Sequence, residues 1–287
     1  MEKKKNILIA TDFNDLSLNA SLKFCKFLFK DSTTNYFLLH VTEEIGFFGK
    51  LFGQQEECPD CQQFRFDELK KNIKILYGLD VETYVRKGRI SSEINNFCKE
   101  KDIELIVAGT SNSCDNTIGA NTHRLIRTTD YPLMTINMNI DPKPIRNILL
   151  PVELMLSSRQ KVKDAISWAK AYGAKITILS GIWEKSANDT YKKIMTIAHS
   201  TQDFILNKGI DCEVVMMKDL NESKDYADGV IKYMNDEKNQ VDLTIVMGRD
   251  ETTDFSADPR SQDVVRFAKV PVVCVPLKKS GMSANFL

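Results

Sequence analysis

The sequence lacks a long apolar run and an excess of either charge. No stretch approaches the roughly 18 apolar residues of a membrane-spanning helix, and the apolar segment after the N-terminal lysines is too short for a signal peptide. The 287 residues include 39 basic and 39 acidic ones, so no net charge attracts nucleic acid. We therefore expect a cytoplasmic globular protein with neither a nucleic-acid partner nor a membrane partner.

Motifs of the common catalytic sites are also missing. The chain has three histidines, and we find no Ser-His-Asp order, no His-Glu-x-x-His and no Gly-x4-Gly-Lys-Ser/Thr. His40 ends an apolar strand, which favours a packed or backbone-bonded imidazole over a catalytic one. With no evident nucleophile or general base, the sequence favours a protein that is not an enzyme, with slow nucleotide hydrolysis as an alternative.

The seven cysteines are an odd number, which argues against a disulfide framework. Four of them lie in apolar stretches, where a free thiol acts as a small hydrophobic group: Cys25, Cys98, Cys212 and Cys274.

Cys58 and Cys61 form a Cys-x-x-Cys pair, the spacing that suits two thiolates on one zinc ion or a redox disulfide. One pair supplies only two of the four ligands of a structural zinc, so a second pair from a dimer partner, or other residues, would have to complete the site. Three readings stay open here: a surface loop with two free thiols, a zinc site, and a redox pair.

The chain contains a repeat with an offset near 140 residues, which is a domain length. "KNILIATDF" at 5–13 recurs as "RNILLPVEL" at 146–154, and "NYFLLHVTE" at 35–43 recurs as "KITILSGIW" at 175–183. A proline-containing connection separates the copies. We predict two domains, 1–142 and 143–287.

Each copy alternates short apolar strands with amphipathic helices, which predicts an α/β fold: two tandem, doubly wound, five-stranded parallel sheets of Rossmann-like type. Ser91 is the expected N-cap of one helix. The first copy should bury three helical stripes: Leu18, Leu22, Cys25 and Phe29; Phe66, Leu69, Ile73 and Leu76; and Ile94, Phe97 and Cys98.

In such sheets ligands bind beyond the carboxyl ends of the strands, where the strand order reverses. In the first copy this rule selects Ala10, Thr11 and Asp12 after the first strand, His40 and Val41 after the second, and the loop that follows Gly109. Asp12 offers an acceptor for an adenine amino group or a ribose hydroxyl.

The loop after Gly109 leads into a helix through Gly119, Ala120, Asn121 and Thr122. A helix N-terminus carries unpaired N–H groups and partial positive charge, which suit phosphate oxygens. Gly109 would allow the backbone to approach such a ligand closely.

These residues together resemble the universal stress protein family, present here as a tandem pair over nearly the whole chain. The resemblance rests on "ILIATDF", "LLHV", "GANTHRLIR" and "YPLMTIN". It implies ATP or another adenosine nucleotide held by Asp12, Val41, Gly109 and Gly119. It also implies a regulatory role in stress survival, and a homodimer or intrachain pseudo-dimer through the fifth strands.

The first copy departs from the family's Gly-x2-Gly-x9-Gly-Ser/Thr pattern at three points. Asn112 stands where the second glycine is expected, the following loop is shorter, and Ala120 replaces the Ser or Thr whose hydroxyl would bond a phosphate. Thr122 is a possible substitute two positions on. The departures predict weak nucleotide binding.

The second copy departs further, with Glu153 in place of the aspartate and Gly181 in place of the valine. Asp258 and Pro259 stand where the Gly-Ser pair is expected, and they put a carboxylate in the anion's place and remove one N–H donor. We expect the second domain to be structural.

Overall fold

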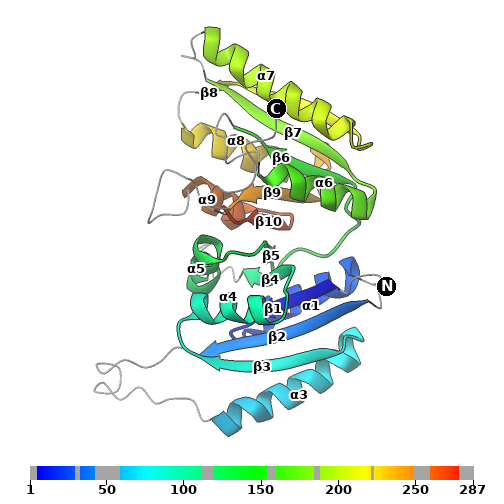
Figure 1. The fold of residues 1–287 in the computed structure, drawn as a ribbon, viewed down its shortest axis with the longest axis vertical. Helices are drawn as coiled ribbons and strands as arrows, with labels where there is room; N and C mark the ends of the chain where they lie inside the picture. The colour runs from blue at the N-terminus through cyan, green and yellow to red at the C-terminus, as the bar shows by residue number, and fades with distance from the viewer. Residues whose placement is uncertain are drawn as a thin grey trace, which may run out of the picture. The chain divides into compact units, whose positions relative to one another are not determined.

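Strands alternate with helices along the described part of the chain in the computed structural model (Figure 1). The structure describes residues 5–29, 33–42, 59–110, 119–153, 160–183, 188–220, 223–248 and 259–277. The contacts divide the chain into two units, one made mainly of Met1–Pro144 and the other of Ile145–Ala268 and Val272–Leu287. Each unit is an α/β fold of its own, as the repeat predicted.

The first unit contributes five parallel strands in the order β3-β2-β1-β4-β5. The order reverses between β1 and β4, because the chain runs outward from β1 to β3 and then returns to the other side of β1. The elements are β1 (Lys5–Ala10), α1 (Asp15–Leu28), β2 (Thr34–Thr42), α3 (Pro59–Tyr77), β3 (Val81–Lys87), α4 (Ile90–Glu100), β4 (Leu105–Thr110), α5 (Ala120–Thr128) and β5 (Leu133–Asn137).

Two pairs of helices cover this sheet: α1 contacts α3, and α4 contacts α5. Crossovers between parallel strands are right-handed, so helices on the outward path and on the return path lie on opposite faces. Strands covered in this way are buried along most of their length, as β4 is. The edge strand β3 is instead buried at Val81 and intermediate or exposed over the rest of its length.

The second unit repeats this plan with strand order β10-β9-β6-β7-β8, again all parallel. The prediction of two doubly wound five-stranded sets is confirmed. The elements are β6 (Asn147–Pro151), α6 (Lys161–Tyr172), β7 (Lys175–Trp183), α7 (Asn188–Leu206), β8 (Cys212–Leu220), α8 (Ser223–Asn235), η2 (Glu237–Asn239), β9 (Leu243–Met247), α9 (Pro259–Phe267) and β10 (Val272–Val275).

Most of the predicted helical stripes face the core, with two corrections. Leu76 was expected to be buried with Phe66 and Ile73, but it is 66% exposed whereas those two are 1% exposed. Ser91 was expected to cap α4, but the helix begins at Ile90 and Arg89 holds the N-cap position without a side-chain bond. Ser91 therefore lies inside the first turn.

The four cysteines predicted to act as hydrophobic groups are free and buried, two in each unit. Burial raises the pKa of Cys98, Cys212 and Cys274 to about 12, because the thiolate loses its hydration. The pKa of Cys25 is raised further by the same cause. These thiols are protonated packing groups at neutral pH.

Candidate functional site

The carboxyl ends of β2, β1 and β4 lie side by side in the first unit. β1 pairs with β2 up to Ala10 and Leu39, and on its other side with β4 at Ile9 and Val107. The residues that follow or end these strands thus meet at the point where the strand order reverses, which is where ligands bind in doubly wound sheets. Asp12, Val41 and Gly109 stand at these three positions.

The turn after β1 is held by its own side chains. Thr11 Oγ1 accepts a hydrogen bond from the Phe13 backbone N–H at 2.9 Å, and Asp12 Oδ1 accepts one from the Asn14 N–H at 3.0 Å. Asn14 in turn caps α1, because its Oδ1 accepts from the Ser17 N–H at 3.1 Å. Asp12 is exposed, so its carboxylate is held in position by the turn and stays open to solvent.

The Phe13 ring packs beside the carboxyl ends of β1 and β2, against His40. This residue was not identified from the sequence. Its backbone has φ +62°, in the left-handed region that few non-glycine residues adopt. Its ring centroid lies 4.4 Å from that of His40 and 4.9 Å from that of Phe66, and the Arg65 guanidinium carbon lies 4.4 Å from the ring centroid. The site therefore has an aromatic surface with a cation beside it.

The His40 side chain is hydrogen-bonded to the backbone, as predicted. Its Nδ1 lies 2.9 Å from the Thr11 carbonyl oxygen. The second unit has an equivalent bond at the same place in the repeat, where Ser180 Oγ donates to the Val152 carbonyl at 2.9 Å. Because two different side chains make the same link between the first and second strands, this link belongs to the fold of each unit.

Gly109 is required by packing. A Cβ atom there would lie 2.2 Å from the Ser17 carbonyl oxygen and 2.6 Å from the Ser17 Cα, both backbone atoms of α1. Thr122 is 8% exposed, and its Oγ1 donates to the Gly109 carbonyl at 3.4 Å. Its hydroxyl thus points to the strand, which differs from the suggestion that it substitutes for a phosphate-binding hydroxyl.

The helix start that was predicted to hold phosphate is present. α5 begins at Ala120, and Gly119 occupies its N-cap position, which has no side-chain hydrogen bond within the described residues. Asn121 is exposed on the first turn. The N–H groups of this turn are therefore not capped by Gly119. Asn112 lies outside the described residues.

The corresponding strand end in the second unit is filled. A Cβ at Gly181 would lie 2.5 Å from Leu220 Cδ1 and 2.7 Å from Tyr226 Cδ2. Tyr226 is 3% exposed, and its hydroxyl donates to the Leu179 carbonyl at 3.1 Å. A buried tyrosine from α8 therefore packs against β7 where the first unit has Val41. Asp258 lies outside the described residues, and Pro259 begins α9.

A metal site is not formed by the described part of the chain, where no three His, Cys, Asp or Glu side chains come together as a possible ligand group. Cys58 lies outside the described residues, as does the side chain of Cys61. The zinc and redox hypotheses for this pair therefore stay predictions.

Comparison with solved structures shows the fold class of the whole chain. A universal stress protein from Archaeoglobus fulgidus DSM 4304 is 12% identical with a TM-score of 0.72, over 97% of this chain and 100% of that one. A functionally unknown protein from Pseudomonas aeruginosa PAO1 is 14% identical with a TM-score of 0.59, over 95% and 92%. No curated protein sequence matches the chain.

The sequence of the first unit also matches a known family. Residues 4–137 match the model of the universal stress protein family. The first domain is therefore a universal stress protein domain, as the resemblance predicted, and the structural alignment extends over both units. In the described part of the chain, no helix has the length and apolar character needed to cross a bilayer.

Proposed function

We propose that this chain is a stress-response regulatory protein whose first domain, 1–142, binds an adenosine nucleotide weakly and whose second domain, 143–287, is structural. The observation that carries the proposal is the meeting of Asp12, Val41 and Gly109 at the strand-order reversal of the first unit, with the start of α5, which Gly119 does not cap with a side chain, following β4.

Each group at this edge has a part in binding. The Asp12 carboxylate, held by its turn, accepts from a ribose hydroxyl or the adenine amino group, and the Val41 backbone meets the base. The N–H groups at Gly119–Thr122 bind phosphate oxygens. The Phe13 ring and the Arg65 guanidinium offer a stacking surface and a cation.

The binding should be weak, because the sequence lacks part of the usual donor set. Ala120 has no hydroxyl for a phosphate, and the Thr122 hydroxyl is directed to Gly109. One missing charge-assisted hydrogen bond costs about 1.5–3 kcal/mol, which is roughly a tenfold loss of affinity or more.

The second domain is proposed as structural because its strand end has no room for the same ligand. Gly181 is covered by Leu220 and Tyr226, and a nucleotide there would have to displace a buried, hydrogen-bonded tyrosine. Pro259 also removes one N–H donor from the start of α9.

Titration calorimetry with ATP and ADP tests the nucleotide site. We expect wild-type heat that is lost in Asp12→Ala and kept in Glu153→Ala, which changes the equivalent position of the second domain. Ala120→Ser should bind about tenfold more tightly, because it restores a hydroxyl donor on the first turn of α5. No phosphate release above the blank is expected.

Two outcomes would refute the assignment. One is the absence of heat at millimolar nucleotide in both wild type and Ala120→Ser. The other is an equal loss in Asp12→Ala and Glu153→Ala, which would place any binding elsewhere. Circular dichroism confirms that each variant is folded before it is titrated.

Pairing through the fifth strands, either within one chain or between two chains, is part of the proposal as well. Light scattering on the purified protein decides between a monomer and a dimer. A monomeric mass favours the intrachain pair, and a dimeric mass favours the homodimer.

A further inference from the structure

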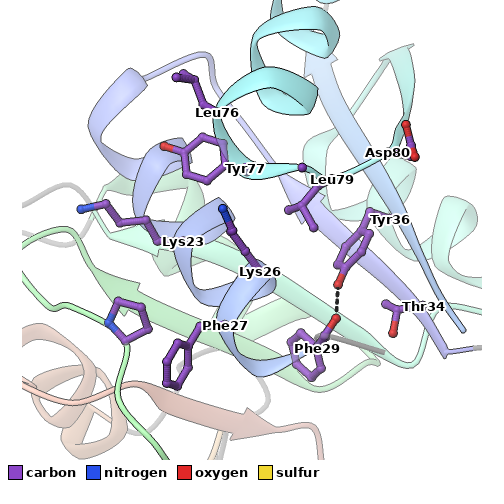
Figure 2. Close-up of a pocket in the computed structure, with 12 residues that line it drawn as sticks. Lys23, Lys26, Phe27, Phe29, Thr34, Tyr36, Leu76, Tyr77, Leu79 and Asp80 are labelled. Carbon is purple, nitrogen blue, oxygen red and sulfur yellow. Dashed lines mark hydrogen bonds between the residues drawn. The ribbon is translucent and has the colours of Figure 1, made fainter. Parts of the chain in front are cut away.

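A cavity of about 840 Å³ opens in the first unit near the start of β2. It therefore lies at the amino-terminal ends of the strands, whereas the candidate nucleotide site lies at their carboxyl ends. Figure 2 shows residues from α1, from the end of α3 and from the start of β2 around it. The lining consists of Lys23, Lys26, Phe27, Phe29, Thr34, Tyr36, Leu76, Tyr77, Gly78, Leu79, Asp80 and Pro142. Its volume is that of a small-molecule pocket, which is usually about 300–1,000 Å³.

Aromatic and aliphatic side chains form part of the cavity walls. Tyr36 and Leu79 are buried, and the Tyr36 hydroxyl donates to the Phe29 carbonyl at 2.6 Å, which fixes its ring (Figure 2). Leu76, the residue expected to face the core, is instead 66% exposed and borders this cavity. Exposed leucine beside a concave apolar surface favours an apolar ligand over water.

Two cations stand on the α1 side. Lys23 and Lys26 are three residues apart on the helix, so they lie on the same face. Lys23 Nζ lies 3.5 Å from Asp141 Oδ1, but both side chains are more than half exposed, which makes this a weak ion pair. Lys26 is exposed, and no acceptor for it is found among the described residues.

Two further ionisable groups line the cavity. Asp80 pairs with Lys74, but both side chains are more than half exposed, so this ion pair is weak as well. The pKa of Tyr77 is raised, mainly because burial removes water from its hydroxyl, and the Lys23 ammonium offsets part of this increase.

Thr34 supplies a second, independent indication of a ligand. Among the described residues its Oγ1 is the buried side-chain oxygen that has no hydrogen-bond partner. A buried hydroxyl without a partner costs free energy, and such groups in native proteins usually have a water, ion or ligand to bond. Thr34 lines the cavity.

We propose that this cavity binds a small organic monoanion with a flat apolar body, such as an aromatic carboxylate. The carboxylate lies between Lys23 and Lys26, and the apolar body lies against Tyr36, Leu76 and Leu79. The site is separate from the nucleotide site and does not depend on it.

The probe for the test is 2-naphthoate, with the uncharged 2-naphthamide as its matched control. Binding is followed by NMR at the backbone amides of Gly78 and Leu79, which line the cavity. We expect saturable shifts with millimolar naphthoate and much weaker shifts with the amide. Added salt should weaken the naphthoate binding.

Variants separate the two lysines from general charge effects. Lys26→Gln should weaken naphthoate binding about fivefold, and the Lys23→Gln/Lys26→Gln double variant about tenfold or more. Lys99→Gln changes an exposed lysine on α4 and should leave the affinity unchanged. All three lysines are exposed, so these variants should fold, and thermal melts confirm it.

The proposal is overturned if naphthoate shifts no cavity amide at millimolar concentration, or if naphthamide binds equally well. It is also overturned if Lys99→Gln weakens binding as much as Lys26→Gln does. Asp12→Ala should leave naphthoate binding intact, so failure of this site and failure of the nucleotide site give different results.

Discussion

Gly109→Ala should destabilise the first unit in the absence of any nucleotide. The added Cβ would lie 2.2 Å from the Ser17 carbonyl oxygen, whereas real Cβ atoms essentially never approach closer than 3.0 Å. Either α1 or β4 must therefore move by roughly 0.8 Å, the difference between these two distances.

That movement is resisted on both sides. β4 is buried and paired with β1 and β5. The Ser17 carbonyl also accepts from the Ser21 hydroxyl at 3.0 Å, and α1 is tied at its start by the Asn14 cap. Overpacking of a core costs about 1–3 kcal/mol, and a clash with backbone lies at the upper end, so we expect a loss of about 3 kcal/mol.

Urea unfolding followed by far-UV circular dichroism measures this loss. Both tryptophans, Trp168 and Trp183, belong to the second unit, so their fluorescence reports that unit separately. We expect the dichroism transition to begin at lower urea while the fluorescence transition changes less. Gly78→Ala is the matched control, because its Cβ meets nothing within 4 Å and only its φ of +70° is unfavourable. It should cost about 1 kcal/mol.

A Gly109→Ala variant within about 0.5 kcal/mol of wild type would refute the reasoning, because that is the range of ordinary surface substitutions. It would mean that α1 yields freely at Ser17. The glycine would then be explained better by ligand binding than by packing, and the nucleotide titration of the same variant would show it.

Two further predictions concern polar groups. Thr34→Val should stabilise the protein by about 1 kcal/mol in urea unfolding, because it removes a buried hydroxyl that lacks a partner among the described residues; a destabilised variant would contradict this. Hydrogen bonds from Lys175 and Thr177 lower the pKa of Glu213 from its usual 4.5. Its contribution to stability is therefore complete above the unfolded value and is lost as the pH falls through the lower folded value. In Glu213→Gln, the free energy of unfolding of the second unit, followed by tryptophan fluorescence, should fall less steeply with pH below about pH 5 than in wild type. The same pH dependence in both proteins would contradict this prediction.

The helix stripes show how far periodicity carries. Ile94, Phe97 and Cys98 lie within one turn of each other, and all three are buried as predicted. From Phe66, Ile73 is only about 20° out of phase, whereas Leu76 is about 80° out of phase at 3.6 residues per turn. This angular offset places Leu76 at the surface. The i, i+3, i+7 pattern from Phe66 holds over two turns, but it does not extend to Leu76, ten residues away.

The candidate site was predictable where it depends on strand ends alone. Asp12 and Gly109 were found because the carboxyl ends of neighbouring parallel strands meet at one edge. The Phe13 ring was not found, because its direction depends on a left-handed backbone that the sequence does not signal. Arg65 reaches the ring from a distant helix, and only tertiary structure brings them together.

The second domain shows the same limit. The sequence showed Gly181 in place of the valine as a departure from the family pattern, and the structure adds which side chains lie against it. Tyr226 comes from α8, and its register over β7 depends on how that helix packs. A sequence pattern can show that a binding residue is missing, but it does not show which side chain takes its place.

The labelling rates of the four buried thiols would report how often each part of the protein opens. Cys25 and Cys98 belong to one unit, and Cys212 and Cys274 to the other. Because alkylating reagents react with exposed thiolate, each of these thiols reacts only when the structure around it unfolds locally. Mass spectrometry of the labelled peptides would then time the two halves of the chain independently, under native conditions and without any introduced probe.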